Sequence, residues 1–311
     1  MFNKKYILVS IKKLTNEDQT AVRELKIDQK NIRFFRDVLM QQFRFSEVKG
    51  GWNLDFFIDS DYQQRLFVEF EEGECSTIKN RTKKFNQLTQ LAFVESAEPH
   101  LDEFSCEMTS LLIRGSKAIK VKDLYQASTH CGYIDGRGAQ YIHLNKNPEI
   151  ENSFGKSQFY RHVLLHSLAY AYLMVMEQLS NALVQAVSEQ KNEDELRQIY
   201  KKVVLFNARY FLYQPINLEA PAMCEAWKRV DQVLGISQTN QELIKQIENV
   251  HYILNLENDK KLAQEKEKAA ADIEHRNHIE NKYNQRLALV AIWISFIGLI
   301  SVVDIIKNWI K

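Results

Sequence analysis

The residue types best suited to chemistry gather at positions 161–166, where the chain reads Arg-His-Val-Leu-Leu-His. His162 and His166 are four residues apart, so on a helix they share one face and could bind a metal ion together. The glutamate of a metalloprotease HExxH motif is missing between them. The spacing therefore predicts a helix whose histidines are hydrogen-bonded in or beside the core, with metal binding as the alternative.

Other enzyme motifs are missing from the sequence. The glycine-rich stretch Gly132–Gly138 lacks the Lys-Ser/Thr of a P-loop, so it predicts a turn rather than a phosphate site. Neither a GxSxG nor a CxxC motif occurs, and the cysteines are widely spread, at Cys75, Cys106, Cys131 and Cys224. Cofactors are therefore unknown from the sequence, with a divalent cation as the one candidate.

Composition excludes some classes of protein. The 311 residues carry 41 basic and 40 acidic side chains, and this net charge of +1 gives no indication of nucleic-acid binding. Glycine and proline are scarce, at 10 and 4 residues, so few positions break a helix. We expect a helix-rich protein of the α+β class.

The first 150 residues mix short strands and helices, which indicates an α/β cytosolic domain. The dipeptides Gly50-Gly51 and Asp135-Gly136 predict hairpin turns. Periodicity predicts strands at 5–11, 43–49, 52–58 and 65–71, and helices at 29–43, 80–94 and 101–113.

Beyond the polar stretch 145–155 the pattern is helical. We expect helices at 157–189, 192–213 and 222–234, with Gly235 as a C-cap and Ser237 as the next N-cap. No proline or glycine follows Asn240 until Gly298, which predicts a stalk helix about 70 Å long. A 4-3-4 spacing typical of coiled coils makes four residues the predicted oligomerisation seam: Leu243, Ile247, Val250 and Leu254.

An uncharged apolar run, Leu287–Val303, predicts a single transmembrane helix over residues 287–306. A buried core helix is the alternative. Basic residues before the run favour a cytoplasmic N-terminal part, at a membrane that we take to be a bacterial inner membrane. The expected organisation is an α/β domain at 1–150, a helical region at 151–236, the stalk at 237–286, the span at 287–306 and a tail at 307–311.

Small residues follow one stripe of the predicted span, with an acidic residue at its far end. Such a stripe lets helices approach closely, and in a closed ring it could line a pore with a ring of carboxylates at its mouth. These candidate residues for pore lining or helix contact are Ala291, Ser295, Gly298, Ser301 and Asp304.

The order of elements resembles the CorA-type magnesium transporter superfamily, across about residues 150–305. The stretches that carry the resemblance are FYRHVLLHSLAYAYLMVMEQLSNAL, ELRQIYKKVVLFNARYFLYQ and NQELIKQIENVHYIL leading to NQRLALVAIWISFIGL. The Gly-Met-Asn motif of that family and a second span are missing, so no selectivity residue carries over. The resemblance implies a membrane-bound homo-oligomer, a pentamer by preference, in which a cytosolic domain senses an unknown small-molecule effector and signals to a possible ion channel.

Two other hypotheses remain open. Arg161 followed by His166 resembles the catalytic motif of HEPN ribonucleases, which implies a membrane-tethered, metal-independent ribonuclease acting in stress or phage defence. In that case Arg161 would hold the phosphate and His166 would move the proton of the 2′-hydroxyl. The third hypothesis is a tail-anchored scaffold that binds a protein partner.

Overall fold

The chain divides by its internal contacts into two units, Met1–Glu248 (unit 1) and Asn249–Lys311 (unit 2). The computed structural model describes residues 4–14, 26–27, 30–75, 87–96, 101–144, 153–189 and 193–309. At 26–27, 30–31, 153 and 296–309 it describes the backbone alone. Unit 1 therefore contains both the α/β region and the helical region that follows it.

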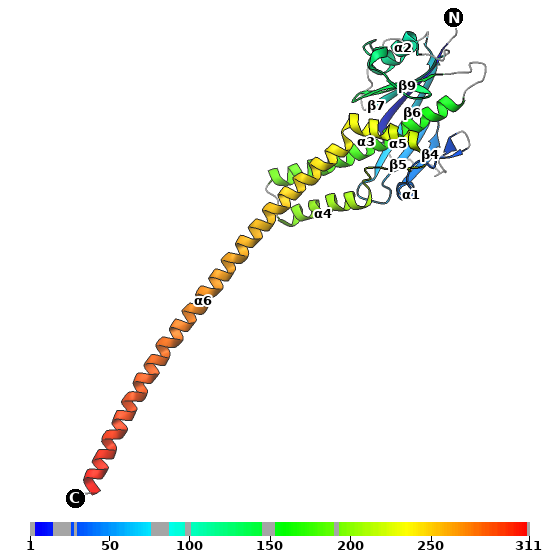
Figure 1. Cartoon of the computed structure of the whole chain (residues 1–311). Coiled ribbons are helices and arrows are strands. Elements are labelled where there is room, and N and C mark those ends of the chain that lie inside the picture. The colour runs from blue at the N-terminus through cyan, green and yellow to red at the C-terminus, as the bar shows by residue number, and fades with distance from the viewer. Residues whose placement is uncertain are drawn as a thin grey trace. The chain divides into compact units, whose positions relative to one another are not determined.

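An eight-stranded mixed sheet forms the centre of unit 1, in the order β4-β5-β6-β1-β7-β10-β9-β8 (Figure 1). Neighbouring strands are antiparallel except β7 and β10, which run parallel. The connection between those two passes through α2 (Glu103–Arg114), as a parallel pair requires a crossover. The strands are β1 Lys5–Lys13, β4 Phe43–Val48, β5 Gly51–Phe56, β6 Gln64–Glu74, β7 Gln87–Ser96, β8 Tyr125–Gln126, β9 His130–Asp135 and β10 Gly138–Leu144.

Short elements complete the α/β region. The strands β2 (Lys26–Ile27) and β3 (Lys30–Asn31) form a separate pair. One turn of helix, α1 (Asp37–Met40), precedes β4, and the 3-10 turn η2 (Val121–Asp123) precedes β8.

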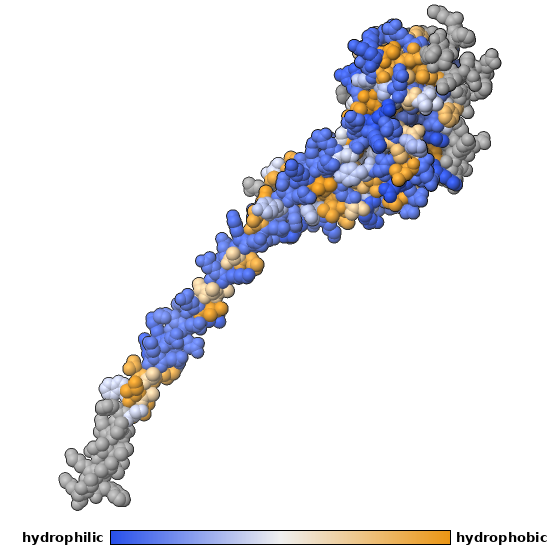
Figure 2. All heavy atoms as spheres, in the orientation of Figure 1, coloured by the Kyte–Doolittle hydropathy of each residue, from blue (hydrophilic) through white to orange (hydrophobic). Residues whose placement is uncertain are grey.

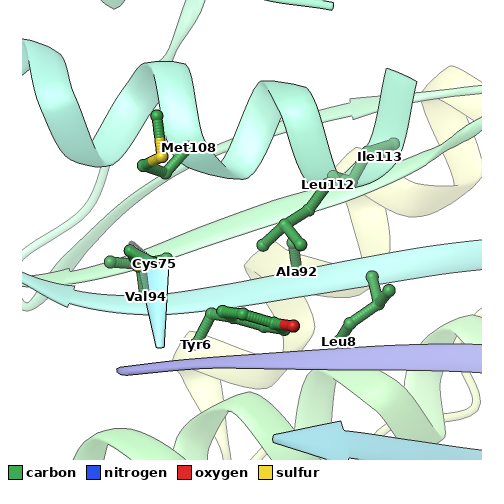
Figure 3. Close-up of a cluster of buried hydrophobic side chains, with 8 residues drawn as sticks. All are labelled: Tyr6, Leu8, Cys75, Ala92, Val94, Met108, Leu112 and Ile113. Atoms are coloured by element: carbon green, nitrogen blue, oxygen red, sulfur yellow. The ribbon is translucent and has the colours of Figure 1, made fainter. Parts of the chain in front are cut away.

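Both faces of the sheet are covered, because side chains alternate between the faces along each strand. On one face, Tyr6 and Leu8 of β1 point towards α2 (Figure 3). The whole cluster there consists of Tyr6, Leu8, Cys75, Ala92, Val94, Met108, Leu112 and Ile113. On the other face, Phe93 of β7 contacts Phe159 of α3 (Ser153–Ser188), with ring centroids 5.2 Å apart.

Aromatic side chains join the sheet to the helices α3, α4 (Glu193–Arg209) and α5 (Pro221–Leu234). Tyr172 of α3 is the centre of this group, because it stacks on Phe57 at 5.3 Å and lies 6.3 Å from Trp227 of α5. Its hydroxyl donates to the carbonyl oxygen of Tyr210 at 3.0 Å. Burying such large rings contributes roughly 2–3 kcal/mol each, so the helical region folds together with the sheet.

The helix α6 (Ile236–Trp309) begins in unit 1 and continues through unit 2. Gly235 ends α5 in the left-handed conformation, at φ 65°, which confirms it as the C-cap. The expected N-cap Ser237 is wrong, because α6 already begins at Ile236 and Ser237 lies inside its first turn. The backbone N–H and the hydroxyl of Ser237 both donate to the carboxylate of Asp231, at 2.7 Å each.

The predicted transmembrane helix over residues 287–306 is wrong. Within the described part of the chain, no helix is both long enough and apolar enough to cross a membrane. The uncharged run Leu287–Val303 amounts to about 25 Å of helix, which is shorter than the ~30 Å hydrocarbon core, and Arg286 and Asp304 bound it. The expected membrane location rested on that helix and is wrong with it.

The helix expected at 80–94 is also wrong where the structure describes it, since Gln87–Ser96 forms β7. The helix expected at 101–113 is confirmed as α2, and the two predicted hairpins are confirmed as β4–β5 and β9–β10. Residues 80–86 of the first prediction, and most of the boundary expected at 145–155, lie outside the described residues.

Candidate functional site

Histidines from three elements meet on the face of the sheet that α3 covers. His130 of β9 and His143 of β10 are directly paired across the two strands. The ring of His130 stacks on Tyr141 with centroids 4.2 Å apart, and it lies 5.3 Å from His162 of α3. Tyr141 and His162 are 4.9 Å apart. These four residues, of which His130 is partly exposed and the other three are buried, form a histidine cluster that joins β9, β10 and α3.

A cation from α5 lies beside this cluster. The guanidinium of Arg229 sits 4.3 Å from the ring centroid of Tyr125, which in turn lies 5.9 Å from the ring of His130. A guanidinium over an aromatic face is attracted by the ring quadrupole. Its charge also opposes protonation of the nearby imidazoles, so the neighbourhood favours neutral histidines.

Burial sets the protonation of the histidines. Burial, with smaller contributions from His143 and Arg229, lowers the pKa of His130 to about 4. It also lowers the pKa of His166 to about 4 and that of His162 well below its usual value. These imidazoles are neutral at neutral pH, since removing a cation from water disfavours the charged form.

The two residues of the HEPN-like motif face different ways on α3. Five residues at about 100° each place Arg161 and His166 roughly 140° apart around the helix. His166 is only 2% exposed, whereas Arg161 is partly exposed and its Nε is buried without a hydrogen-bond partner among the described residues. One copy of the chain therefore does not bring the pair together at its surface.

His162 and His166 have no third metal ligand near them in the described part of the chain. Across the described residues, no group of three His, Cys, Asp or Glu side chains is arranged to hold a metal ion. Both histidines are buried, so their predicted position in the core is confirmed.

The predicted oligomerisation seam is mostly buried within the single chain. Leu243 and Ile247 are each 2% exposed and Leu254 is 5% exposed, while Val250 is partly buried. Near the start of α6, the side-chain amide of Asn240 donates to that of Asn207 on α4 at 2.7 Å. These four side chains are thus largely covered in a single chain, and their part in association between copies stays a prediction.

A groove of about 310 Å³ lies between α3 and α6 inside unit 1. Leu173, Met176 and Leu243 give it an apolar lining. The remaining lining residues are polar or acidic: Glu177, Ser180, Asn181, Thr239, Glu242 and Gln246. No lysine, arginine or histidine is among these nine residues, so the groove has an acidic edge.

Apolar side chains on the part of α6 in unit 2 are exposed (Figure 2). Seven of them follow one line along the helix, because they are separated by three or four residues or by sums of these steps. We call this line the C-terminal stripe. Its residues are Leu262, Ala269, Ile273, Tyr283, Leu287, Val290 and Ile294. At about 100° per residue they fall within an arc of roughly 120°. Lys266, Arg276 and Glu280 occupy the remaining positions of the same line.

The residues assigned to a pore or to helix contact do not all fall in the described part. Ala291 and Ser295 are exposed, and the hydroxyl of Ser295 donates to the carbonyl oxygen of Ala291 at 2.8 Å. Gly298, Ser301 and Asp304 are part of α6, but only their backbone is described. The pore assignment depended on the transmembrane helix and is wrong with it.

Sequence reasoning missed the groove and the contribution of His130 and His143. Each of their residues belongs to an ordinary strand or helix pattern. The histidines meet only because β9, β10 and α3 pack together, and the groove forms only where α3 and α6 lie beside each other. No family model, curated protein or solved structure matches the chain. The functional argument therefore depends on the geometry of the chain itself.

Proposed function

We propose that the protein is a homo-oligomeric scaffold whose copies associate through the C-terminal stripe of α6. The observation that carries this proposal is the stripe itself, in which Leu262, Ile273, Tyr283, Leu287, Val290 and Ile294 are each 51–65% exposed. A helix with so few contacts of its own is only marginally stable in water. Burying the stripe against a second copy supplies the missing contacts.

The spacing favours a second copy as the partner. Steps of three and four residues are those of a coiled coil, in which equivalent stripes of two or more helices interlock. Arg276 and Glu280 lie one turn apart on the stripe, so they can form an ion pair within each helix and neutralise each other's charge there. The association would gather several α/β units in one assembly.

A matched pair of variants tests this proposal. Leu287→Asn/Ile294→Asn changes two stripe residues, and Leu289→Asn/Ile292→Asn makes the same change on the opposite side of the helix. Losing two buried aliphatic side chains per copy costs roughly 3 kcal/mol or more, so the stripe variant should raise the dissociation constant at least about 100-fold. The control variant should associate as the unchanged protein does.

Sedimentation or light scattering measures the mass of each variant at matched concentrations. A monomeric unchanged protein would refute the scaffold role. Equal dissociation of both double variants would show association through general hydrophobicity rather than through the stripe. A mass of five chains would favour the CorA-type resemblance, and any other number would count against it.

The HEPN-type ribonuclease stays a prediction. The resemblance to that family implies that Arg161 and His166 would carry out the RNA cleavage. His166 is buried, so it would have to become accessible to RNA first. Incubating labelled RNA with the protein and with Arg161→Ala tests the idea. RNA cleavage that disappears in the variant would support it, and RNA left intact by both proteins would refute it.

A further inference from the structure

We propose that two copies of the chain pair antiparallel along the C-terminal stripe, about a two-fold axis near His278. The proposal rests on the scaffold role and adds to it the direction and the register of the two helices. It depends on where the charged residues in and beside the stripe lie relative to its midpoint.

The seven residues of the stripe and the three charged positions on its line form an unbroken series of ten positions, from Leu262 to Ile294. Its steps alternate between four and three residues, like the a and d positions of a coiled coil. His278 is the midpoint, because Leu262 and Ile294 lie 16 residues before and after it. In an antiparallel pair centred there, each residue faces the residue of the partner copy that lies equally far on the other side of His278.

The layers nearest the axis pair opposite charges. Arg276 and Glu280 lie two residues before and two residues after His278, so Arg276 of each copy faces Glu280 of the other. Together with the ion pair that the two residues can form within each helix, these contacts make a ring of four alternating charges. Sliding the helices by one heptad would place Arg276 opposite Leu287 or Ile273 instead. Charges inside an apolar seam therefore select one register.

The other layers of the seam suit close packing. They pair Leu262 with Ile294, Lys266 with Val290, Ala269 with Leu287 and Ile273 with Tyr283. One of these pairs contains a charge, and Lys266 can lay its aliphatic stem on Val290 while its ammonium stays in water. The stripe is thus complementary to the same stripe in the reverse direction.

A second pair of opposite charges lies beside the seam. Asp272 and Arg286 are both exposed, and each comes one residue before a seam position. In the antiparallel pair these flanking positions adjoin, so Asp272 of each copy meets Arg286 of the other. No acidic residue lies three or four positions from Arg286 in its own helix, which leaves the partner copy to supply a carboxylate. At the axis itself, the exposed Ile279 of each copy meets that of the other.

A parallel pair would place like charges together. Each seam residue would then face its own equivalent, which puts Lys266, Arg276 and Glu280 each opposite a like charge. Asp272 of one copy and Arg286 of the other would lie 14 residues apart, or about 21 Å along the axis. Like charges that face each other weaken association, so the charge pattern favours the antiparallel pair.

Cross-linking between cysteines of the full chain tests the direction. Ala269→Cys and Leu287→Cys are made in separate chains, and both chains carry Cys224→Ser because the other three native cysteines are buried. Positions 269 and 287 of two copies face each other in the antiparallel pair, whereas the two copies of position 269 lie about 27 Å apart. With a short thiol cross-linker, an equal mixture of the two variants should therefore give at least about tenfold more cross-linked dimer than either variant alone.

Reversing the flanking charges tests the register. Asp272→Arg and Arg286→Asp each bring like charges together twice in the pair, so each should raise the dissociation constant about tenfold. The two changes combined restore opposite charges and should return the constant to within about threefold of the unchanged protein. Within one chain the two residues are about 21 Å apart, so only a second, antiparallel copy can produce this rescue. Glu267→Arg is the control, because it reverses a charge outside the seam and should leave association unchanged.

The outcomes separate this proposal from the scaffold role on which it rests. A full chain that sediments as a monomer would refute both. Association with cross-linking of Ala269→Cys to itself and of Leu287→Cys to itself would show a parallel assembly, which overturns the antiparallel pair and keeps the scaffold. A combined charge reversal that associates no better than either single reversal would overturn the register.

Discussion

Gly155 illustrates how one position constrains the histidine cluster. A Cβ atom added there would lie 2.7 Å from Cδ2 and 2.8 Å from Cγ of His143, which is 2% exposed on β10. Real Cβ atoms do not approach a neighbour so closely, and a ring held in the core cannot move aside cheaply. Glycine is therefore the residue that lets α3 begin against the sheet.

We predict that Gly155→Ala destabilises the protein, although alanine is normally the better helix former by about 1 kcal/mol. The clash with His143 should outweigh that gain and cost about 1–2 kcal/mol net. The melting temperature followed by circular dichroism should fall by about 3–6 °C. Gly136→Ala is the control, because a Cβ there meets nothing within 4 Å. A Gly155→Ala protein that melts at or above the unchanged protein would contradict this argument.

The buried histidines predict a loss of stability in mild acid. The unfolded chain binds a proton on each histidine as the pH falls through about 6.5, whereas the folded chain leaves His130 and His166 neutral down to about pH 4. The unfolded state therefore binds more protons between these two values, and the free energy of unfolding falls as the pH falls. Below about pH 4 the loss levels off.

Urea unfolding at pH 7.5 and pH 5 measures this effect. The fully buried His166 alone should account for about 2 kcal/mol of the difference. His166→Phe keeps a ring in the core without a titrating group, so its unfolding free energy should change less between the two pH values. His278→Gln, at an exposed position of α6, should change as much as the unchanged protein does. The same pH dependence in all three proteins would show that other groups cause it.

At the scale of elements, Asp102 fixes the start of α2. Its carboxylate accepts hydrogen bonds from the backbone N–H of Ser105 at 2.7 Å, from the Lys4 ammonium at 2.7 Å and from the Ser96 hydroxyl at 2.8 Å. Burial alone would raise the pKa of Asp102, but these hydrogen bonds together with that of the Ser105 hydroxyl lower it to about 2. The cap thus ties α2 to the beginning of β1 and to the end of β7.

We predict that Asp102→Ala lowers the free energy of unfolding by about 2 kcal/mol, since it leaves the helix N-terminus and Lys4 without this acceptor. Asp102→Asn keeps an oxygen for the cap but removes the charge that Lys4 pairs with, so it should cost less. Glu103→Ala, one residue further and exposed, should change stability by less than about 0.5 kcal/mol. Chemical unfolding of the three variants checks this order, and equal costs for Asp102→Ala and Glu103→Ala would exclude the cap as the cause.

Local signals predicted the elements that local chemistry decides. Gly50 adopts φ 84° between β4 and β5, as a tight hairpin requires, and Gly235 ends α5 in the left-handed region. The helix predicted for Gln87–Ser96 was wrong because the apolar residues there fit the spacing of a helix as well as that of a strand. The pairing of this segment between β1 and β10 makes it a strand. Neither the meeting of His130, His143 and His162 nor the groove beside Leu243 follows from local pattern, since each depends on how distant elements cross.

At the scale of the whole molecule, α6 has two roles that divide along its length. Its buried residues all come before Lys261 in the described part of the helix: Ile236, Asn240, Leu243, Ile247 and Leu254. The C-terminal stripe comes entirely after it. A chain that ends at Lys261 would therefore keep every buried side chain of α6 and lose the stripe.

We predict that this truncated chain folds as stably as the full chain under dilute conditions and does not associate. Stability in unit 1 comes from the sheet and its two helical layers, and the removed residues of unit 2 bury none of their described side chains. The melting temperature at low concentration should stay within about 3 °C of the full chain, since a larger shift would require a loss of about 1 kcal/mol or more. Because association stabilises by mass action, only the full chain should melt higher as its concentration rises. A truncated chain that still forms oligomers, or that unfolds many degrees earlier at low concentration, would show that association and folding are not divided at this point of α6.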